Sequence, residues 1–224
     1  MVEVWLIRHG VTAWNVDRRW QGHSDIPLNK EGRQQAANVA AHMLRVHATT
    51  PFDVLLSRCI VMNDLSRARG TAESVGKMLS LPVELDARFR EEHYGLLEGH
   101  TTDEIMNCPI LAAVHQARSE GPLAPNDPGE SRQEGLDRAA LALQFIAETF
   151  RHAKRIAVFT HGGFILNCFR HLGGYPAAYP VVKENKCPKI ANTSISILKV
   201  ESANDSHVWT AEQWGSTPHR QSRE

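Results

Sequence analysis

The sequence predicts an α/β protein, a three-layer sandwich in which a mostly parallel sheet carries helices on both faces. Short apolar runs typical of buried strands alternate with longer segments whose apolar residues recur at helical spacing. The chain has 224 residues, a usual size for one such domain. We therefore expect a single domain over residues 1–215, with a lid around 101–128 and a polar tail over 216–224.

The first half of the chain alternates strands and helices. Residues 2–7 form an apolar run that ends in a polar turn, and Asn29 is placed to cap a helix that continues to about His47. A short buried strand is expected over 52–56. The next helix has apolar residues at helical spacing: Leu65, Ala68, Ala72, Val75 and Leu79.

The second half continues the alternation after a less regular stretch. Residues 101–120 are expected to be helical, and the prolines and glycines of 121–129 indicate a loop. Ser131 and Glu134 form a capping box that opens the next helix. The remaining predicted elements are strands over 83–85, 156–159, 194–200 and 207–214, and a short helix that ends near Gly173.

Charge and cysteine content exclude several classes of protein. The 25 basic side chains are balanced by 25 acidic ones, whereas a non-specific nucleic-acid surface needs a basic surplus. No apolar stretch approaches 18 residues, so we expect no membrane span. The four cysteines are scattered without zinc-site spacing, and Met1 leads directly into a strand-like run rather than a secretory signal. We therefore expect a cytoplasmic protein with reduced thiols.

One bias is hidden inside the balanced charge. The basic residues comprise 18 Arg and 7 Lys. Arginine is the planar cation that holds phosphate through two parallel hydrogen bonds, so the bias is compatible with an anionic ligand. Codon usage or lineage is the simpler explanation of such an excess on composition alone.

Two predicted strands end in a histidine followed by a glycine. One runs into Arg8-His9-Gly10 and the other into Thr160-His161-Gly162. Active sites of open α/β sheets lie at the carboxyl ends of strands, and a glycine lets the main chain approach a ligand closely. A single histidine in such a place is commonly structural. Two of them, with Arg8 beside one, indicate a functional site.

Further motifs accompany these strand ends. Arg8-His9-Gly10 is followed by Thr12 and Trp14-Asn15, and other segments follow in order: Trp20 to Leu28, Asp64 to Ala68, Arg90 to Gly95, Pro128 to Ser131, Thr160 to Gly163 and Asn192 to Ser194. This ordered set resembles the histidine phosphatase superfamily, in its phosphoglycerate-mutase-like branch. Each motif is weak alone, but the series spans residues 4 to about 200.

The resemblance implies a phosphoryl-transfer site on a small phosphorylated substrate. His9 would attack phosphorus in line and form a phosphohistidine, with its other ring nitrogen held by an acceptor such as a main-chain carbonyl. Arg8 and Arg67 would hold the phosphoryl oxygens, His161 would add a charged or donor group there, and Asn15 a neutral donor. Because these groups neutralise the phosphate, neither a metal nor another cofactor is expected.

Glu91 is the expected general acid and base. The resemblance places the acid three residues before Tyr94, which selects Glu91 over Glu92. Gln21 would order water or a phosphate oxygen, and Gly162 and Tyr94 would line the substrate site.

Simpler interpretations of the same residues stay open. Arg67 could form a helix-surface ion pair with a residue such as Glu73, and Gln21 could cap a turn. His9 and His161 could share a metal ion, although no ordered set of further Asp, Glu or His ligands accompanies them.

The chain departs from the family pattern shortly before Arg67. An insertion of about five residues, 58–62, precedes Asn63. It could displace Arg67 from the site, or bring Arg58 or Cys59 to it. We expect Arg67 to remain in the site, because the segment that holds it begins a well-patterned helix.

The favoured function is a phosphomonoester phosphatase. Arg118 is the only arginine or lysine of the expected lid, 101–128, whereas a phosphoglycerate mutase needs further cations for the substrate carboxylate and for the bisphosphate. A fructose-2,6-bisphosphatase usually accompanies a kinase domain, of which the chain has no motif. The alternatives are the mutase and, from another class, a catalytically weak phosphate-binding or scaffolding module. Oligomeric state and physiological substrate do not follow from the sequence.

Overall fold

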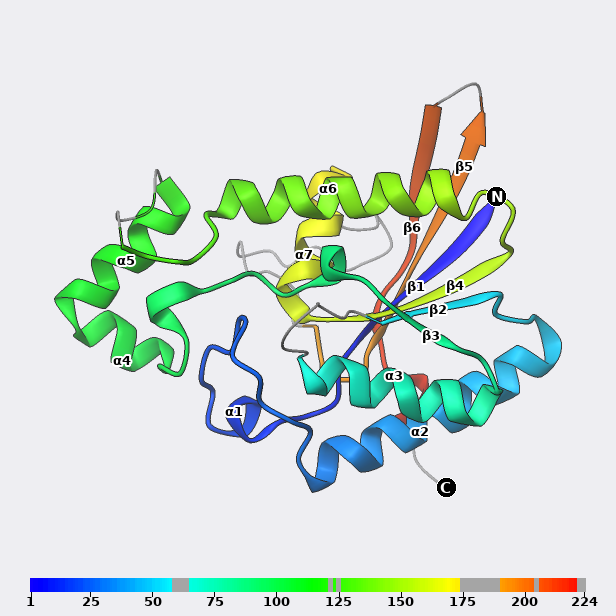
Figure 1. Cartoon of the computed structure of the whole chain (residues 1–224), viewed down its shortest axis with the longest axis horizontal. Helices are drawn as coiled ribbons and strands as arrows, with labels where there is room; N and C mark the ends of the chain where they lie inside the picture. Colours follow the sequence, from blue (N-terminus) through cyan, green and yellow to red (C-terminus); the bar gives the residue numbers. More distant parts are fainter. Residues whose placement is uncertain (58–64, 121–122, 124–125, 174–189, 204–205, 221–224) are drawn as a thin grey trace.

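The computed structural model describes residues 1–57, 65–120, 123, 126–173, 190–203 and 206–220. At its centre is a six-stranded sheet in the order β3-β2-β4-β1-β5-β6 (Figure 1). Four strands are mutually parallel, and the last two add an antiparallel pair at one edge. The strands are β1 (Val2–Arg8), β2 (Val54–Ser57), β3 (Val83–Leu85), β4 (Arg155–Thr160), β5 (Ile195–Ala203) and β6 (Ser206–Ser216).

Two pairs of helices cover the two faces of this sheet, which confirms the predicted three-layer α/β sandwich (Figure 1). Successive side chains of a strand point to opposite faces. In β1, Val4 and Leu6 therefore pack with α6 and α7, whereas Trp5 and Ile7 pack with α2 and α3. The covering helices are α2 (Lys30–Thr49), α3 (Ser66–Leu79), α6 (Arg132–Thr149) and α7 (Gly162–His171).

Side-chain caps set the starts of two of these helices. The side-chain oxygen of Asn29 accepts a hydrogen bond from the Gly32 amide at 2.8 Å, and α2 begins at the next residue. Ser131 and Glu134 form the predicted capping box at the start of α6. These caps satisfy amides that have no partner within the helix, so local sequence determines where each helix begins.

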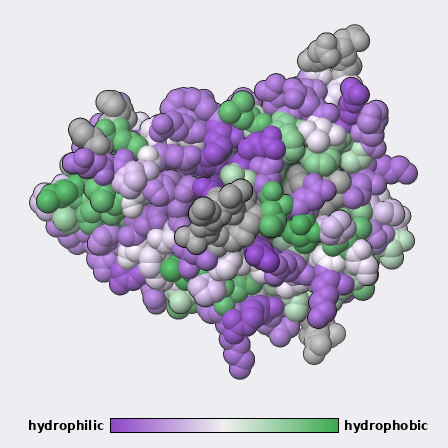
Figure 2. All heavy atoms as spheres, viewed as in Figure 1, coloured by the Kyte–Doolittle hydropathy of each residue, from purple (hydrophilic) through white to green (hydrophobic). Residues whose placement is uncertain are grey.

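The segment expected to form a lid contains two helices, α4 (Thr102–Asn107) and α5 (Pro109–Glu120). They lie at the opposite end of the molecule from the β5–β6 pair (Figure 1). Ile105 and Val114 face inward and pack with Leu97. Met106 and Ile110 face outward, and Figure 2 shows hydrophobic side chains at the left, over these helices, on a mostly hydrophilic face.

The remaining short elements are α1 (Ala13–Val16) and three 3-10 turns, Ala87–Phe89, Gly95–Leu97 and Pro218–Arg220. The last of these lies in the segment expected to be a loose polar tail. His219 and Arg220 contact the Thr193 hydroxyl at 3.0 and 3.3 Å. Hydrogen bonds to the loop before β5 therefore order this turn. Within the described part of the chain, no helix combines the length and the apolar character needed to cross a membrane.

Candidate active site

Two neighbouring parallel strands bring His9 and His161 together at the carboxyl ends of the strands. β1 and β4 pair in register with Arg8 opposite Thr160, so a histidine follows each strand end. The His9 amide donates to the Thr160 carbonyl at 2.9 Å, and the centres of the two imidazole rings lie 5.1 Å apart.

The tautomer and charge of His9 follow from its surroundings. Nδ1 of His9 lies 2.7 Å from the carbonyl oxygen of Gly10. Since a carbonyl oxygen only accepts, Nδ1 carries the proton and Nε2 keeps its lone pair. Burial, followed by the positive charges of Arg67 and Arg8, holds the pKa of His9 well below its ordinary value. The ring is therefore neutral at neutral pH.

Arg67 is fully buried and Arg8 is half-buried, and main-chain carbonyls hold both guanidinium groups. Arg8 donates to Ile190 at 2.5 Å. Arg67 donates to Ser24 at 2.8 Å and to Gly22 at 2.7 Å. Desolvation lowers the pKa of both, that of Arg67 to about 10. Arginine side chains keep their positive charge in proteins. These carbonyls fix each side chain without neutralising its charge.

Neither arginine is fully paired. Nε of Arg8 and Nε of Arg67 are buried without a hydrogen-bond partner among the described residues. The ion pair with Glu73 that sequence left open for Arg67 belongs to Arg69, 2.5 Å away on the helix surface. Buried donors without partners are costly, so their retention in this place indicates a site for an anionic ligand.

His161 lies behind the cavity rather than in its wall. It is fully buried, and neither ring nitrogen has a hydrogen-bond partner among the described residues. Burial and then the charge of Arg67 hold its pKa well below the ordinary value. A lowered pKa favours the neutral ring in this structure, in which one ring nitrogen is a donor.

The carboxylate of Glu91 lies at the N-terminus of α7. It accepts hydrogen bonds from the amides of Gly163 at 3.0 Å and Phe164 at 2.9 Å, and these amides have no partner within the helix. Its neighbour Glu92 is used differently, because it accepts from Asn167 at 2.7 Å and from Arg118 at 3.3 Å. The two adjacent carboxylates therefore have different partners, main-chain amides for Glu91 and side chains for Glu92.

A second ion pair supports the main chain around Glu91. Arg138 of α6 donates to both carboxylate oxygens of Glu130, at 2.7 and 2.8 Å, and to the main-chain oxygens of Arg90 at 2.6 Å and Glu91 at 3.1 Å. Arg138 and Glu130 thus form a structural pair behind the cavity.

The other predicted residues also lie around the cavity. Oδ1 of Asn15 accepts from the Thr12 amide and from Asn192, both at 3.1 Å, so its Nδ2 group is left as a donor. Gln21 accepts from the Thr12 hydroxyl at 2.9 Å. Tyr94 is half-buried, and desolvation of its hydroxyl, together with the negative charge of Glu91, raises its pKa well above the ordinary value. Its hydroxyl is therefore protonated.

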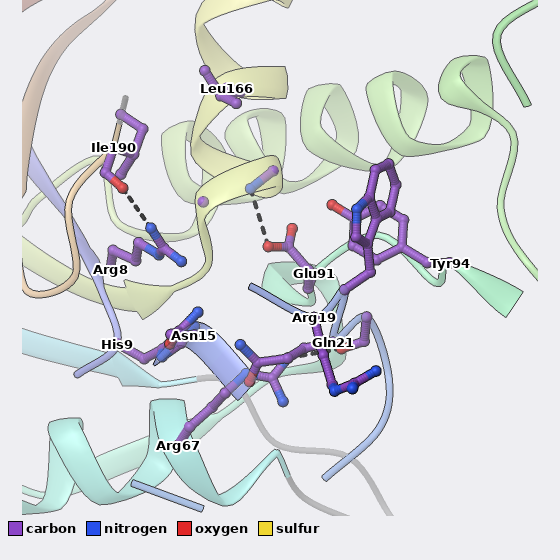
Figure 3. Close-up of a pocket in the computed structure, with 14 residues that line it drawn as sticks. Arg8, His9, Asn15, Arg19, Gln21, Arg67, Glu91, Tyr94, Leu166 and Ile190 are labelled. Atoms are coloured by element: carbon purple, nitrogen blue, oxygen red, sulfur yellow. Dashed lines mark hydrogen bonds between the residues drawn. The ribbon is translucent and has the colours of Figure 1, made fainter. Parts of the chain in front are cut away.

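These side chains line one cavity of about 410 Å³ (Figure 3). Figure 3 shows Glu91 between Arg8 and His9 on one side and Tyr94 on the other. The predicted residues in the wall are Arg8, His9, Asn15, Gln21, Arg67, Glu91, Tyr94 and Gly162. The insertion at 58–62, with Arg58 and Cys59, lies outside the described residues, but Arg67 shares the cavity with His9.

Comparison with known proteins shows the family in which these site residues occur together. The chain matches the histidine phosphatase superfamily (branch 1) over residues 4–216. It belongs to that superfamily. Similar proteins include phosphoglycerate mutase-like protein 4 of Arabidopsis thaliana, 33% identical over 97% of this chain and 86% of the relative. A probable phosphoglycerate mutase of Escherichia coli is 31% identical over 96% of this chain and 90% of its own.

Solved structures similar to this histidine phosphatase superfamily member carry phosphatase names. A mycobacterial glucosyl-3-phosphoglycerate phosphatase aligns with a TM-score of 0.76 and 26% identity, over 97% of this chain and 100% of its own. A phosphoserine phosphatase from Entamoeba histolytica, solved with 3-phosphoglyceric acid, aligns with a TM-score of 0.73 and 25% identity, over 98% and 99%. Phosphatases and mutases among its relatives support a phosphoryl-transfer enzyme.

This superfamily member has further wall residues that sequence reasoning did not name as site residues: Arg19, Trp20, Gly22, Gly163, Leu166 and Ile190. Arg19 and Trp20 directly precede Gln21, so their position beside a predicted site residue was a usable signal. Leu166 lies one helical turn after Gly162 and Gly163 on α7. Ile190 follows no motif, and only the fold brings its carbonyl to Arg8.

Proposed function

We propose that the protein is a metal-independent phosphomonoester phosphatase that acts through a phosphohistidine on His9. The observation that carries the proposal is the state of that ring. His9 is neutral, its proton is committed to Gly10, and its free Nε2 shares a cavity with two cationic guanidinium groups. A neutral imidazole is the form that can attack phosphorus.

In the first step, the Nε2 lone pair of His9 forms a bond to phosphorus while the bond from phosphorus to the ester oxygen breaks. Arg8 and Arg67 hold the phosphoryl oxygens, since each has a buried Nε–H without a protein acceptor among the described residues. Asn15 adds a neutral donor through Nδ2. Glu91, in its protonated form, gives its proton to the leaving alkoxide.

In the second step, a water attacks the phosphohistidine. The Glu91 carboxylate takes a proton from that water as its oxygen bonds to phosphorus, and the bond between phosphorus and Nε2 of His9 breaks. Inorganic phosphate leaves, and both His9 and protonated Glu91 are restored. Because one carboxyl group serves as acid and then as base, the cycle is balanced in protons.

Hydrolysis is favoured over a mutase reaction because of the lid. Arg118, the only arginine or lysine of residues 101–128, donates to the main-chain oxygen of His93 at 2.7 Å and pairs with Glu92. It is buried and does not line the His9 cavity. Residues 101–128 therefore offer no arginine or lysine side chain to the His9 cavity that would retain a bisphosphate, which favours attack of water on the phosphohistidine.

The mutase remains the second candidate because the sequence relatives named above carry mutase names. Arg19 supports it as well, since this guanidinium lines the cavity. Its Nη1 group, however, is held by the Gly99 carbonyl at 2.6 Å and by Glu104 at 2.9 Å, which compensates its charge.

Phosphate release from a panel of phosphomonoesters tests the proposal. Wild type is assayed with and without a chelator, next to His9→Ala and the matched exposed-histidine variant His152→Ala. We expect release by wild type and His152→Ala, with and without chelator, and none by His9→Ala. No release from any ester would favour the scaffolding alternative. Loss of activity with chelator would indicate a metal site. Conversion of 3-phosphoglycerate to 2-phosphoglycerate that needs added 2,3-bisphosphoglycerate would indicate the mutase.

A further inference from the structure

A second, smaller cavity adjoins the candidate active site. Its volume is about 170 Å³, and it shares four wall residues with the first cavity: Trp20, Tyr94, Gly163 and Leu166. Trp20 packs edge-on against Tyr94 at 4.8 Å and against His115 at 5.5 Å between ring centres. The boundary between the two cavities is therefore largely aromatic and aliphatic.

The rest of the second cavity is basic. Arg118, Arg132 and Arg170 line it, against the single carboxylate of Glu92. Arg118 is committed to Glu92 and to the His93 carbonyl. The other two arginines have donors without a partner in the described part of the chain, and an anion placed between them would be attracted by a net positive charge.

The two spare arginines come from different helices. Arg132 is the first residue of α6, and its side chain makes no hydrogen bond or ion pair with another described residue. Arg170 lies in the last turn of α7, and among the described residues its side chain contacts only Asn167, to which Nη1 donates at 2.9 Å. Only the packing of α6 beside α7 brings them to one cavity, and this arrangement is not used by the chemistry at His9.

The geometry of the reaction directs the leaving group toward this cavity. In-line attack by His9 places the leaving oxygen on the far side of phosphorus, where Glu91 protonates it. Glu91 stands between His9 and Tyr94 (Figure 3). Tyr94 and Gly163 form part of the shared boundary. The Glu91 carboxylate and the Tyr94 hydroxyl both pack against Gly163, because a β-carbon at this position would lie 2.5 Å from Oε1 of Glu91 and 2.9 Å from the Tyr94 hydroxyl oxygen. The remainder of the leaving group thus continues from Glu91 along this boundary.

We propose that the second cavity is a subsite for a second acidic group on the leaving group, a carboxylate or a phosphate, held by Arg132 and Arg170. The preferred substrates are then elongated phosphomonoesters whose acidic group is separated from the ester by an apolar or sugar-like spacer against Trp20 and Tyr94. This inference rests on the proposed phosphatase function.

Matched pairs of esters test the subsite. The first series is ω-carboxyalkyl phosphates of increasing chain length, each paired with the alkyl phosphate of equal length. The second series is α,ω-alkanediol bisphosphates, which distinguishes a carboxylate subsite from a phosphate subsite. We expect the acidic member to have the higher kcat/KM from one particular length onward, through a lower KM, with no preference for the shortest pair.

Substitutions then assign the preference to the two arginines. Arg132→Gln and Arg170→Gln are each expected to lower kcat/KM for the acidic member about 3- to 10-fold, as for loss of a charge-assisted hydrogen bond. The alkyl member should be cleaved as by wild type. Arg132→Lys should restore part of the preference. Arg45→Gln, an exposed arginine of α2 on the opposite side of the sheet, is the matched control.

Binding gives a readout that does not depend on turnover. Calorimetry with the uncleavable ω-carboxyalkyl and alkyl phosphonates should show tighter binding of the acidic member to wild type, and equal binding to the Arg132→Gln/Arg170→Gln double variant. Equal affinity of both members for wild type at every length would overturn the subsite. Absence of phosphate release from every ester, with a binding preference intact, would overturn the phosphatase function instead and leave the subsite standing.

Discussion

The Glu91 carboxylate and the Gly163 amide form a hydrogen bond of 3.0 Å that joins the candidate general acid to the start of α7. A β-carbon added to Gly163 would lie 2.5 Å from Oε1 of Glu91, closer than such atoms approach in proteins. A side chain at position 163 would therefore displace the Glu91 carboxylate, and this contact is the basis of the first prediction.

Gly163→Ala is expected to lower kcat about 10- to 100-fold, because the methyl group displaces the group that transfers the proton. Phosphate release from an alkyl phosphate measures it. Gly70→Ala is the matched control, since its β-carbon would meet Leu28 at an ordinary 3.4 Å within α3. Full activity of Gly163→Ala would mean that Glu91 is not the acid or that its position is not critical.

Glu91→Gln and Glu92→Gln should differ strongly although the residues are adjacent. Glu91→Gln cannot exchange a proton, so alkyl phosphate turnover should fall about 100-fold or more. With p-nitrophenyl phosphate, whose leaving group needs no proton, we expect a burst of p-nitrophenolate followed by slow turnover. Glu92→Gln should stay within a few-fold of wild type, because Glu92 contacts Asn167 and Arg118 instead. Equal losses in the two variants would contradict the assignment.

Arg67→Lys should lower kcat/KM about 100-fold, by analogy with removal of one donor that stabilises transition-state charge. A lysine keeps the charge but cannot donate to Gly22, Ser24 and a phosphoryl oxygen together in a planar fork. The matched control is Arg69→Lys, which alters the exposed pair with Glu73 two residues away. If both variants behave like wild type, Arg67 does not hold the phosphate.

The pH dependence should reflect the lowered pKa of His9. Only the neutral ring attacks, and a lowered pKa keeps it neutral as the pH falls, so kcat/KM should not lose activity through His9 protonation at the ordinary histidine value of 6.5. NMR of the labelled imidazole should show that the His9 ring stays neutral at pH 6, with no proton on Nε2. In Arg67→Gln the His9 pKa should rise, since the Arg67 charge lowers it. Protonation of wild-type His9 near 6.5 would contradict this.

Much of the fold follows from local sequence. The Asn29 cap and the Ser131–Glu134 capping box start α2 and α6 where they were expected, because each cap is made within four residues. The apolar alternation of β1 determines which residues face each helical layer. Such features depend on neighbours in the chain, so a pattern of residue types is sufficient to predict them.

The sequence by itself determined the strand ends, the ordered motifs and the residue types needed for phosphoryl transfer. Only the tertiary structure decided which of the charged residues lie at the His9 cavity, which form ion pairs and which lie at the second cavity. It left Arg67 buried, with an Nε that no described residue accepts from. It also paired Arg118 with Glu92 and placed Arg132 and Arg170 beside a second cavity. The physical reason is that charge, burial and available donors depend on contacts between residues far apart in the chain, and these contacts exist only after the helices have packed on the sheet.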